Sequence, residues 1–314
     1  MSFLEPIDNT FRSGFVALIG RPNVGKSTLL NQLIGKKVSI TSSIAQTTRN
    51  RLRAILTTPK AQMVFVDTPG IHKPHHLLGE RLVKSARRTI GEVDIVVLIF
   101  EGCFSPGKGD IYLVKLLESQ NIPVLVVLNK WDLVNLDLRH QRQEEYKDLF
   151  RDVNWPLFTC SAIKGVGFES LLSSITNHLP IGPYLYPPDM VSDQPERILL
   201  SDLIREQVLI HTREEVPHSV AVIIDRLEEI ALTKKKQPAN TQTAILATIL
   251  VERKSQKGIL IGKGGSMLKK IGHGARLQMK KLISGSVYLE LFVKVSPDWR
   301  SKPSRLNELG YEDN

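Results

Sequence analysis

The sequence predicts an α/β domain, built on a mostly parallel sheet with helices on both faces, followed by a smaller α+β domain. Three observations lead to this prediction. Apolar strand-like runs alternate with amphipathic stretches over residues 15–179, five prolines interrupt both periodicities within residues 180–196, and a new order of helices and strands begins near Arg197. We therefore place the domains at residues 1–182 and 197–300, with a semi-rigid linker at 183–196 and a polar, loosely ordered tail at 301–314.

Length and composition fit a two-domain globular protein. The chain has 314 residues, of which 42% are hydrophobic and 24% charged. Its two cysteines, Cys103 and Cys160, match no metal-ligand spacing and are interpreted as core thiols in a reducing cytosol. The N-terminus does not resemble a signal peptide, and the longest apolar runs are too short to span a bilayer. We expect a cytoplasmic protein with at most peripheral contact with the inner face of the cell membrane.

The charge balance indicates a polyanionic partner. Lys and Arg total 42 and Asp and Glu total 32, so the formal net charge is +10 and the pI is near 9.5. A protein with this charge is attracted to nucleic acid or to an anionic membrane surface. Composition alone does not choose between the two.

Five short runs in the first domain are predicted to be the strands of its sheet. They consist almost entirely of apolar residues, as expected for strands covered on both faces, and lie at residues 15–19, 63–66, 95–100, 124–128 and 157–159. Polar motifs follow several of these runs directly, at the ends of the strands.

The first of these motifs lies between a strand and a helix. Residues 20–27 are Gly-Arg-Pro-Asn-Val-Gly-Lys-Ser and fit the phosphate-binding loop of the P-loop NTPases. Glycines let backbone N–H groups turn toward a β-phosphate, Lys26 reaches the β and γ oxygens, and the Ser27 hydroxyl is offered to Mg²⁺. The start of the helix adds its positive end. The residues predicted to bind nucleotide here are Gly20, Asn23, Val24, Gly25, Lys26, Ser27 and Thr28.

Two further segments are predicted to contact the γ-phosphate and the metal ion. Asp67-Thr-Pro-Gly70 follows a buried strand, so that Asp67 can hold Mg²⁺ through water and Gly70 can turn its amide to the γ-phosphate. A switch segment at residues 41–49 needs a threonine that closes on the metal, and we choose Thr48, with Thr47 second. The predicted metal residues are thus Ser27, Thr48 and Asp67, and the predicted catalytic residues are Lys26, Thr48 and Gly70.

The next motif narrows the nucleotide to guanine. In Asn129-Lys130-Trp131-Asp132 the aspartate can accept hydrogen bonds from guanine N1–H and the 2-amino group, which adenine lacks. The Lys130 stem can lie along the base. After the last strand, Ser161-Ala162 can offer a backbone N–H to guanine O6, with Lys164 alongside. These motifs together predict GTP and GDP as the ligands and Mg²⁺ as the cofactor.

The residue after Gly70 is Ile71, where many small GTPases keep a glutamine that orients water. We therefore expect slow basal turnover, with the attacking water positioned in another way. Asn23 offers one hypothesis, since it could help to hold K⁺ beside the phosphates, and equal rates in K⁺ and Na⁺ would contradict it. His72, His75 and His76 lack a Cys or carboxylate nearby and are interpreted as part of a solvated switch loop rather than a zinc site.

The second domain is predicted to bind nucleic acid. Its expected order is a helix at 198–211, strands at 220–227 and 244–251 around a Lys234–Lys236 turn, a short helix, a glycine loop, a basic helix to about Ile283 and a strand at 287–295. Residues 253–289 contain nine basic residues and no acidic ones. A glycine loop at the start of a helix suits a phosphate backbone, with bases in an aliphatic groove beside it. The predicted RNA-binding residues are Gly262, Lys263, Gly264, Gly265, Lys269 and Lys270.

On these motifs, from the phosphate loop and Gln46-Thr-Thr-Arg49 to the glycine loop, the chain resembles the Era family of ribosome-assembly GTPases over residues 14–300. The resemblance implies a Ras-like fold followed by a type II KH module, cycling between GDP and GTP, and slow Mg²⁺-dependent hydrolysis. It also implies binding of 16S ribosomal RNA near its 3′ end, a role in 30S subunit assembly and rRNA maturation, and RNA binding that GTP favours. We expect a monomer.

Three other interpretations stay open at this point. The chain could be chiefly an RNA-binding scaffold with nucleotide as a structural ligand, which measurable turnover and switch-dependent RNA affinity would argue against. It could be a metabolic P-loop kinase or ATPase, although Asn129 and Asp132 oppose that. It could also be a membrane-surface GTPase that uses the same basic charge, which flotation with anionic vesicles would test.

Overall fold

The computed structural model describes residues 10–42, 44, 47–71, 76–232, 240–283 and 285–311. These form two compact units, which divide between Asp193 and Gln194, except that residues 76–78 are grouped with the second unit. The first unit contains a six-stranded sheet in the order β2-β3-β1-β4-β5-β6, in which only the β2–β3 pair is antiparallel. Its strands are β1 (Arg12–Gly20), β2 (Leu52–Thr57), β3 (Ala61–Asp67), β4 (Ile95–Glu101), β5 (Val124–Asn129) and β6 (Leu157–Thr159). All five strands expected from the sequence are present.

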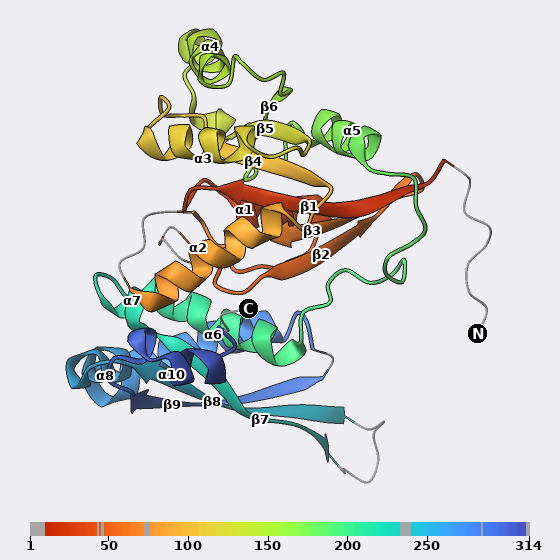
Figure 1. The fold of residues 1–314 in the computed structure, drawn as a ribbon. Coiled ribbons are helices and arrows are strands. Elements are labelled where there is room, and N and C mark those ends of the chain that lie inside the picture. The colour runs from red at the N-terminus through yellow and green to blue at the C-terminus, as the bar shows by residue number, and fades with distance from the viewer. Residues whose placement is uncertain are drawn as a thin grey trace. The chain divides into compact units, whose positions relative to one another are not determined.

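Helices cover both faces of this sheet, as the sequence predicted (Figure 1). Alternate residues of β1 point to opposite faces, with Val16 and Leu18 in one core cluster and Ala17 and Ile19 in the other. Helices α1 and α5 pack on the first face, and α2, α3 and α4 pack on the second. Their bounds are α1 (Lys26–Ile34), α2 (Leu77–Ile90), α3 (Lys108–Glu118), α4 (Arg139–Leu149) and α5 (Phe168–His178), with short 3-10 turns η1 (Trp131–Leu133) and η2 (Leu136–Leu138).

The proline-rich linker pairs with the exposed edge of the first sheet. Ser192 forms an antiparallel bridge with Ala54 of β2. The buried Gln62 side chain accepts hydrogen bonds from the backbone N–H groups of Leu185 and Tyr186 at 2.7 and 2.9 Å and donates to the Tyr186 carbonyl at 2.8 Å. An edge strand otherwise leaves backbone donors and acceptors unpaired, so the linker completes it. The sequence predicted the stiffness of this segment but not its attachment.

The second unit is a three-stranded sheet with helices. Its order is β7-β8-β9, antiparallel between β7 and β8 and parallel between β8 and β9. A parallel pair needs a crossover, which α8 and α9 supply. The elements are α6 (Glu196–His211), α7 (Val216–Ser219), β7 (Ala221–Leu232), β8 (Asn240–Val251), α8 (Lys254–Ile261), η3 (Lys263–Gly265), α9 (Ser266–Met279), β9 (Ser286–Val295), η4 (Trp299–Ser301) and α10 (Pro303–Glu308). The predicted lysine turn at 234–236 lies outside the described residues.

The expectation of loose order after residue 301 was wrong for the residues described there, which end at 311. Residues Pro303–Glu308 form α10, and Leu306 on this helix is fully buried. Just before it, Trp299 is also buried and donates its indole N–H to the Ser219 carbonyl at 2.8 Å, while its ring stacks near Tyr311. These apolar contacts hold a segment whose composition is mostly polar. None of the helices in the described parts of the chain is both long and apolar enough to cross a lipid bilayer.

Candidate functional site

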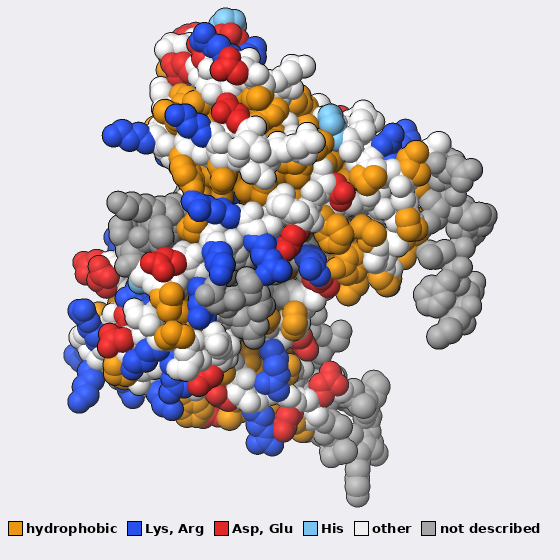
Figure 2. Space-filling view, viewed as in Figure 1, with side chains coloured by type: hydrophobic (Ala, Val, Ile, Leu, Met, Phe, Trp, Pro, Cys, Tyr) orange, Lys and Arg blue, Asp and Glu red, His pale blue; other side chains and the backbone are white. Residues whose placement is uncertain are grey.

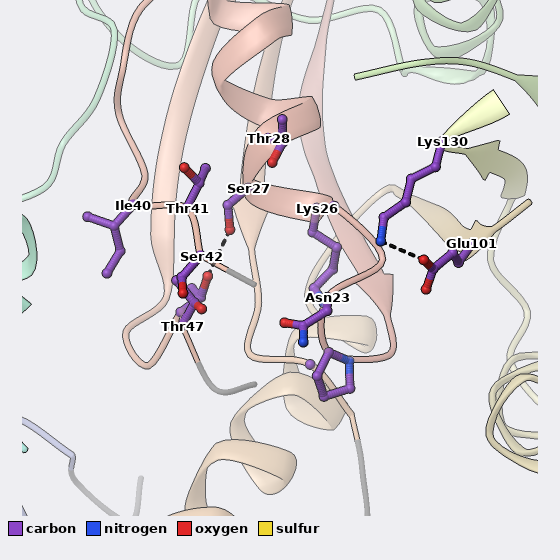
Figure 3. Close-up of a pocket in the computed structure, with 14 residues that line it drawn as sticks. Asn23, Lys26, Ser27, Thr28, Ile40, Thr41, Ser42, Thr47, Glu101 and Lys130 are labelled. Atoms are coloured by element: carbon purple, nitrogen blue, oxygen red, sulfur yellow. Dashed lines mark hydrogen bonds and ion pairs between the residues drawn. The ribbon is translucent and has the colours of Figure 1, made fainter. Parts of the chain in front are cut away.

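A pocket of about 560 Å³ lies at the edge of the first sheet where β1, β3, β4 and β5 end (Figure 3). Strands of a parallel sheet end at one edge, which is where ligands of this architecture bind. The pocket brings together residues that are up to about 100 positions apart in the sequence. Those predicted to contact nucleotide and found in its lining include Asn23, Lys26, Ser27, Thr48, Gly70 and Lys130.

The backbone of the phosphate loop requires glycine at two positions for different reasons. Gly25 caps α1 with a φ of +96°, which L residues rarely adopt, and a Cβ there would lie 2.3 Å from Nδ2 of Asn129. Gly20 has no such φ, but a Cβ would lie 2.5 Å from the Ile99 carbonyl oxygen. The loop therefore packs directly on β4 and on the Asn129 side chain, and its curvature depends on both contacts.

Lys26 is buried at the first position of α1, with its ammonium group held by the phosphate loop itself. Its Nζ donates to the carbonyl oxygens of Gly20 at 3.1 Å and Arg21 at 3.0 Å. Burial lowers the pKa of Lys26 to about 8, although the nearby Asp67 carboxylate acts in the opposite direction. Asp67 is the counterpart, since burial raises its pKa despite Lys26 and three hydroxyl donors. Both charges are poorly solvated, so an added anion at Lys26 and an added cation at Asp67 would each be stabilised.

Replacing Lys26 with methionine is expected to abolish nucleotide binding and to stabilise the nucleotide-free protein at pH 7. Methionine keeps an apolar stem and removes the buried charge. Because the folded pKa of about 8 lies below the usual 10.5, the unfolded chain holds more protons between these values and stability rises with pH across that window. The gain should therefore be largest below pH 8, roughly 1–3 kcal/mol, and shrink toward pH 10.5. Unfolding free energies of both nucleotide-free proteins at pH 7 and 9.5 test this, and a destabilised variant at pH 7 would contradict it.

Three hydroxyl groups converge on one oxygen of Asp67. Ser27, Ser39 and Thr48 donate to Asp67 Oδ2 at 2.7, 3.0 and 3.3 Å, and the Ser27 and Thr48 hydroxyls lie 2.9 Å apart. The other oxygen, Oδ1, is buried and has no hydrogen-bond partner among the described residues. Hydroxyl and carboxylate oxygens are the donors that Mg²⁺ prefers, and an unpartnered buried carboxylate oxygen needs a partner such as a metal-bound water. The predicted metal residues therefore lie together and fit magnesium.

Of the two candidate switch threonines, Thr48 is the one whose hydroxyl faces the metal residues. The Thr47 hydroxyl donates instead to the Ile44 carbonyl at 2.6 Å. Gly70 lies against the phosphate loop, where a Cβ would come within 2.6 Å of the Pro22 nitrogen. Ile71 is 4% exposed and packs in the core. Its apolar side chain is therefore part of the core and carries no group that could orient a water molecule.

Asn129, predicted to bind nucleotide, bonds to the protein's own backbone in this structure. Its side chain is buried and connects two loops, donating to the Val24 carbonyl at 2.8 Å and accepting from the Ala162 N–H at 3.0 Å. The Ala162 N–H, which the sequence analysis assigned to guanine O6, is thus bonded to Asn129 in this structure. Asn129 joins the phosphate loop to the Ser161-Ala162 turn, and this link positions both.

Asp132 and Lys130 each have a partner that orients the side chain. The Ser161 hydroxyl donates to Asp132 Oδ1 and accepts from the Lys164 N–H at 3.2 Å. The Lys130 ammonium lies 2.6 Å from Glu101 Oε1, and Glu101 also lines the pocket (Figure 3). The sequence analysis missed Glu101. Its position could have indicated it, because Glu101 is the last residue of β4 and pairs with Asn129 at the end of the neighbouring strand β5.

Most of the histidine cluster at residues 72–76 lies outside the described residues. His72 and His75 lie outside the described residues. Within the parts of the chain that are described, no three His, Cys, Asp or Glu side chains form a group that could hold a metal ion.

The second unit places the predicted glycine loop between α8 and α9. Gly262, Gly264 and Gly265 all have positive φ angles, of +71°, +59° and +78°. A Cβ on Gly262 would lie 2.9 Å from the Met267 backbone nitrogen, whereas Gly264 and Gly265 have no atom within 4 Å of that position. Gly262 is therefore needed for the turn itself, while the backbone at Gly264 and Gly265 can approach a ligand closely. The Lys263 side chain is exposed.

Beside this loop lies a groove of about 930 Å³, formed by α9, β9 and the end of α6. Leu268, Leu289 and Leu291 give it an aliphatic wall, and Lys269 and Lys270 supply positive charge. The prediction of an aliphatic groove next to the loop thus matches a groove in the structure. Figure 2 shows many Lys and Arg side chains around α8 on the face in view.

Comparison with known proteins assigns both units. A family model described as a 50S ribosome-binding GTPase matches residues 15–130, and a KH-domain model matches residues 215–300. The chain is 56% identical over 301 residues to GTPase Era of Nostoc sp. strain PCC 7120, covering 96% of this chain and 90% of that one. It is 52% identical to GTPase Era of Synechocystis sp. strain PCC 6803, covering 96% and 93%.

Two solved structures match the chain along nearly its full length. A crystal structure of a variant Era from Aquifex aeolicus bound to GDP·AlF₄⁻ is 36% identical with a TM-score of 0.90, covering 96% of this chain and 100% of that one. A crystal structure of Era in complex with MgGDPNP and nucleotides 1506–1542 of 16S ribosomal RNA is 37% identical with a TM-score of 0.90, covering 96% and 99%.

Proposed function

The chain belongs to the Era family of GTPases, and from this premise we propose that it is a GTP-controlled RNA-binding protein of the small ribosomal subunit. The observation that carries the proposal is the presence, in one chain, of a guanine-nucleotide pocket in the first unit and a positively charged glycine loop with an adjoining groove in the second. In this proposal the nucleotide changes the affinity of the loop for the 3′ end of 16S ribosomal RNA during 30S assembly and rRNA maturation.

The residues of the pocket support Mg²⁺-dependent hydrolysis of GTP. We propose that Ser27 and Thr48 hold Mg²⁺ directly and Asp67 holds it through water, with the ion neutralising charge that develops on the phosphates. Lys26, on the buried first turn of α1, would bind the β and γ oxygens, and the Gly70 amide would bind the γ-phosphate. Ile71, whose side chain is apolar and buried, stands where many small GTPases keep the water-orienting glutamine, so we expect slow basal turnover.

Guanine recognition is proposed for residues beside the pocket, which Lys130 joins to its lining. Asp132, oriented by the Ser161 hydroxyl, would accept from guanine N1–H and the 2-amino group. The stem of Lys130, fixed by Glu101, would lie along the base. Lys164 would contact the O6 side, and the Ala162 N–H would exchange its hydrogen bond to Asn129 for one to O6. We also propose that a K⁺ ion is held near Asn23 beside the phosphates. Hydrolysis that is faster in K⁺ than in Na⁺ would support this.

The second unit is proposed to bind single-stranded RNA. The exposed backbone at Gly264 and Gly265, followed by the N-terminus of the 14-residue α9, suits a phosphate backbone, and the leucine-lined groove suits unstacked bases. In the related crystal structure Era carries nucleotides 1506–1542 of 16S ribosomal RNA, which points to that strand as the ligand. We propose that the protein acts in the cytoplasm as a monomer, and peripheral contact with anionic membrane stays a prediction.

RNA selectivity tests this proposal. Protein loaded with a non-hydrolysable GTP analogue is titrated with a strand copying the 3′ end of 16S rRNA and with a scrambled strand of equal composition, both at one fixed salt concentration. We expect at least tenfold tighter binding of the first strand. Equal affinities would mean that charge alone drives binding, and they would contradict a role specific to this RNA.

A further inference from the structure

We propose that Ser39, held in place by Asn31, positions the Asp67 carboxylate for magnesium, and that it does so without binding the metal or the nucleotide itself. The proposal rests on the Mg²⁺-dependent nucleotide binding proposed above. Ser39 donates to Asp67 Oδ2 at 3.0 Å from a side chain that is itself buried. It lies next to Ile40, the first of the three consecutive residues here that line the pocket, but Ser39 is not part of that lining.

Asn31 fixes the backbone of Val38 and Ser39 through three hydrogen bonds. Its Oδ1 accepts from the N–H groups of Val38 and Ser39, both at 2.9 Å, and its Nδ2 donates to the Ser39 carbonyl at 2.7 Å. An amide that uses both of its ends on one short backbone segment leaves that segment little freedom. The neighbouring Val38 is buried as well, so the Ser39 hydroxyl has a defined position relative to α1.

The same helix presents both the metal residue and this clamp. Ser27 and Asn31 are four residues apart on α1 and therefore lie on one face of the helix, one turn apart. Ser27 faces Asp67 directly, and Asn31 reaches Asp67 through Ser39. Helix α1 thus fixes the position of the Asp67 carboxylate through two contacts, the direct one from Ser27 and the indirect one from Asn31 through Ser39.

Ser39 differs from the other two hydroxyl donors in what it can do once a metal is present. Ser27 and Thr48 are the proposed direct ligands, so their oxygens must turn toward the ion. Ser39 has no such task and can keep its hydrogen bond to Oδ2. This leaves Oδ1, which has no partner among the described residues, free to accept from a metal-bound water. Hydrogen bonds of this kind orient ligands, and losing them typically lowers metal affinity about 10- to 100-fold.

Magnesium dependence of nucleotide binding tests the role of Ser39. The full chain is titrated with a fluorescent GDP analogue in EDTA and then at increasing Mg²⁺. For Ser39→Ala we expect the Mg²⁺ concentration at half-maximal effect to rise at least tenfold, with affinity in EDTA within about twofold of the unchanged protein. Unaltered Mg²⁺ dependence would overturn the proposal. Ser13→Ala is the matched control. Ser13 is also buried, but it lies at the start of β1, at the end of the strand away from the phosphate loop, and its substitution should change neither quantity.

Two further variants separate the possible failures. Asn31→Ala should also raise the Mg²⁺ concentration at half-maximal effect. The double variant Ser39→Ala with Asn31→Ala should raise it little more than either single variant, because both act through one hydrogen bond to Asp67. Additive effects would overturn the clamp. Asp67→Asn should abolish the Mg²⁺ effect. If it leaves that effect intact, the proposed magnesium site is wrong; if it abolishes the effect while Ser39→Ala changes nothing, only the role of Ser39 is wrong.

Discussion

Replacing Lys263 and Gly264 together with aspartate is expected to lower affinity for the 16S 3′ strand at least about 100-fold while GTP binding stays unchanged. Lys263 is exposed, and a Cβ on Gly264 would meet no atom within 4 Å, so both new side chains fit without displacing the loop. Gly264 has a φ of +59°, a conformation that aspartate accepts more readily than most residues. The pair removes one cation and adds two anions where the phosphate backbone is expected to lie.

This double substitution is a cleaner test than Gly262→Asp, which changes the first glycine of the loop. A side chain on Gly262 would press on the Met267 backbone nitrogen at 2.9 Å, with φ at +71°. If Gly262→Asp lost RNA binding, the cause could therefore be a distorted loop as readily as a lost contact with RNA. Lys60→Asp, at an exposed lysine in the turn between β2 and β3, removes two of the three charge units that the double substitution removes. It should reduce binding only slightly. RNA affinity within about threefold of the unchanged protein would show that the loop is not the RNA clamp.

Replacing Asp132 with asparagine is expected to lower affinity for guanine nucleotides roughly 100-fold or more and to create affinity for xanthine nucleotides. The carboxylate is proposed to accept from guanine N1–H and the 2-amino group. Xanthine carries a carbonyl at C2, which pairs with a donor. Ser161 donates to Asp132 Oδ1, so the asparagine Oδ1 can keep that hydrogen bond and present its NH₂ group to the base.

Competition of GDP, XDP and ADP for a fluorescent nucleotide measures this change. Asp137→Asn, an exposed aspartate in η2 five positions away, is the control and should leave all three affinities unaltered. If GDP affinity of Asp132→Asn is untouched, the base is read by other residues. A gain of ADP binding would mean that the substitution opened the pocket rather than changed its hydrogen bonding.

Much of the fold followed from local sequence patterns. Buried parallel strands such as β4 and β5 are continuous apolar runs, and the phosphate loop is a contiguous motif whose spacing is set by its own backbone. Strand β2 was missed because it is an antiparallel edge strand of mixed polarity that includes an exposed Arg53. The helix α10 was missed because its main signal is one buried leucine, Leu306, in a polar segment.

The supporting contacts of the site had no local signal. Ser39 and Asp67 are 28 positions apart, and Gln62 and the linker residue Tyr186 are 124 apart. A serine or a glutamine has the same appearance in a sequence whether its side chain is solvated or clamps a distant backbone. Motifs identified the residues expected to touch the ligand, whereas those that hold such residues in place, such as Asn31, became visible only in three dimensions.

The central claim is that nucleotide state controls RNA binding, and one affinity comparison tests it most directly. The full chain is loaded with GDP or with a non-hydrolysable GTP analogue, and each form is titrated with the 16S 3′-end strand at one salt concentration. A ligand can shift an equilibrium only through different affinities for two states, so coupling must appear as a difference between these titrations. We predict tighter binding with the analogue, by about 5- to 150-fold. Equal affinities would contradict a switch on this strand and would mean that the second unit binds RNA independently of the nucleotide.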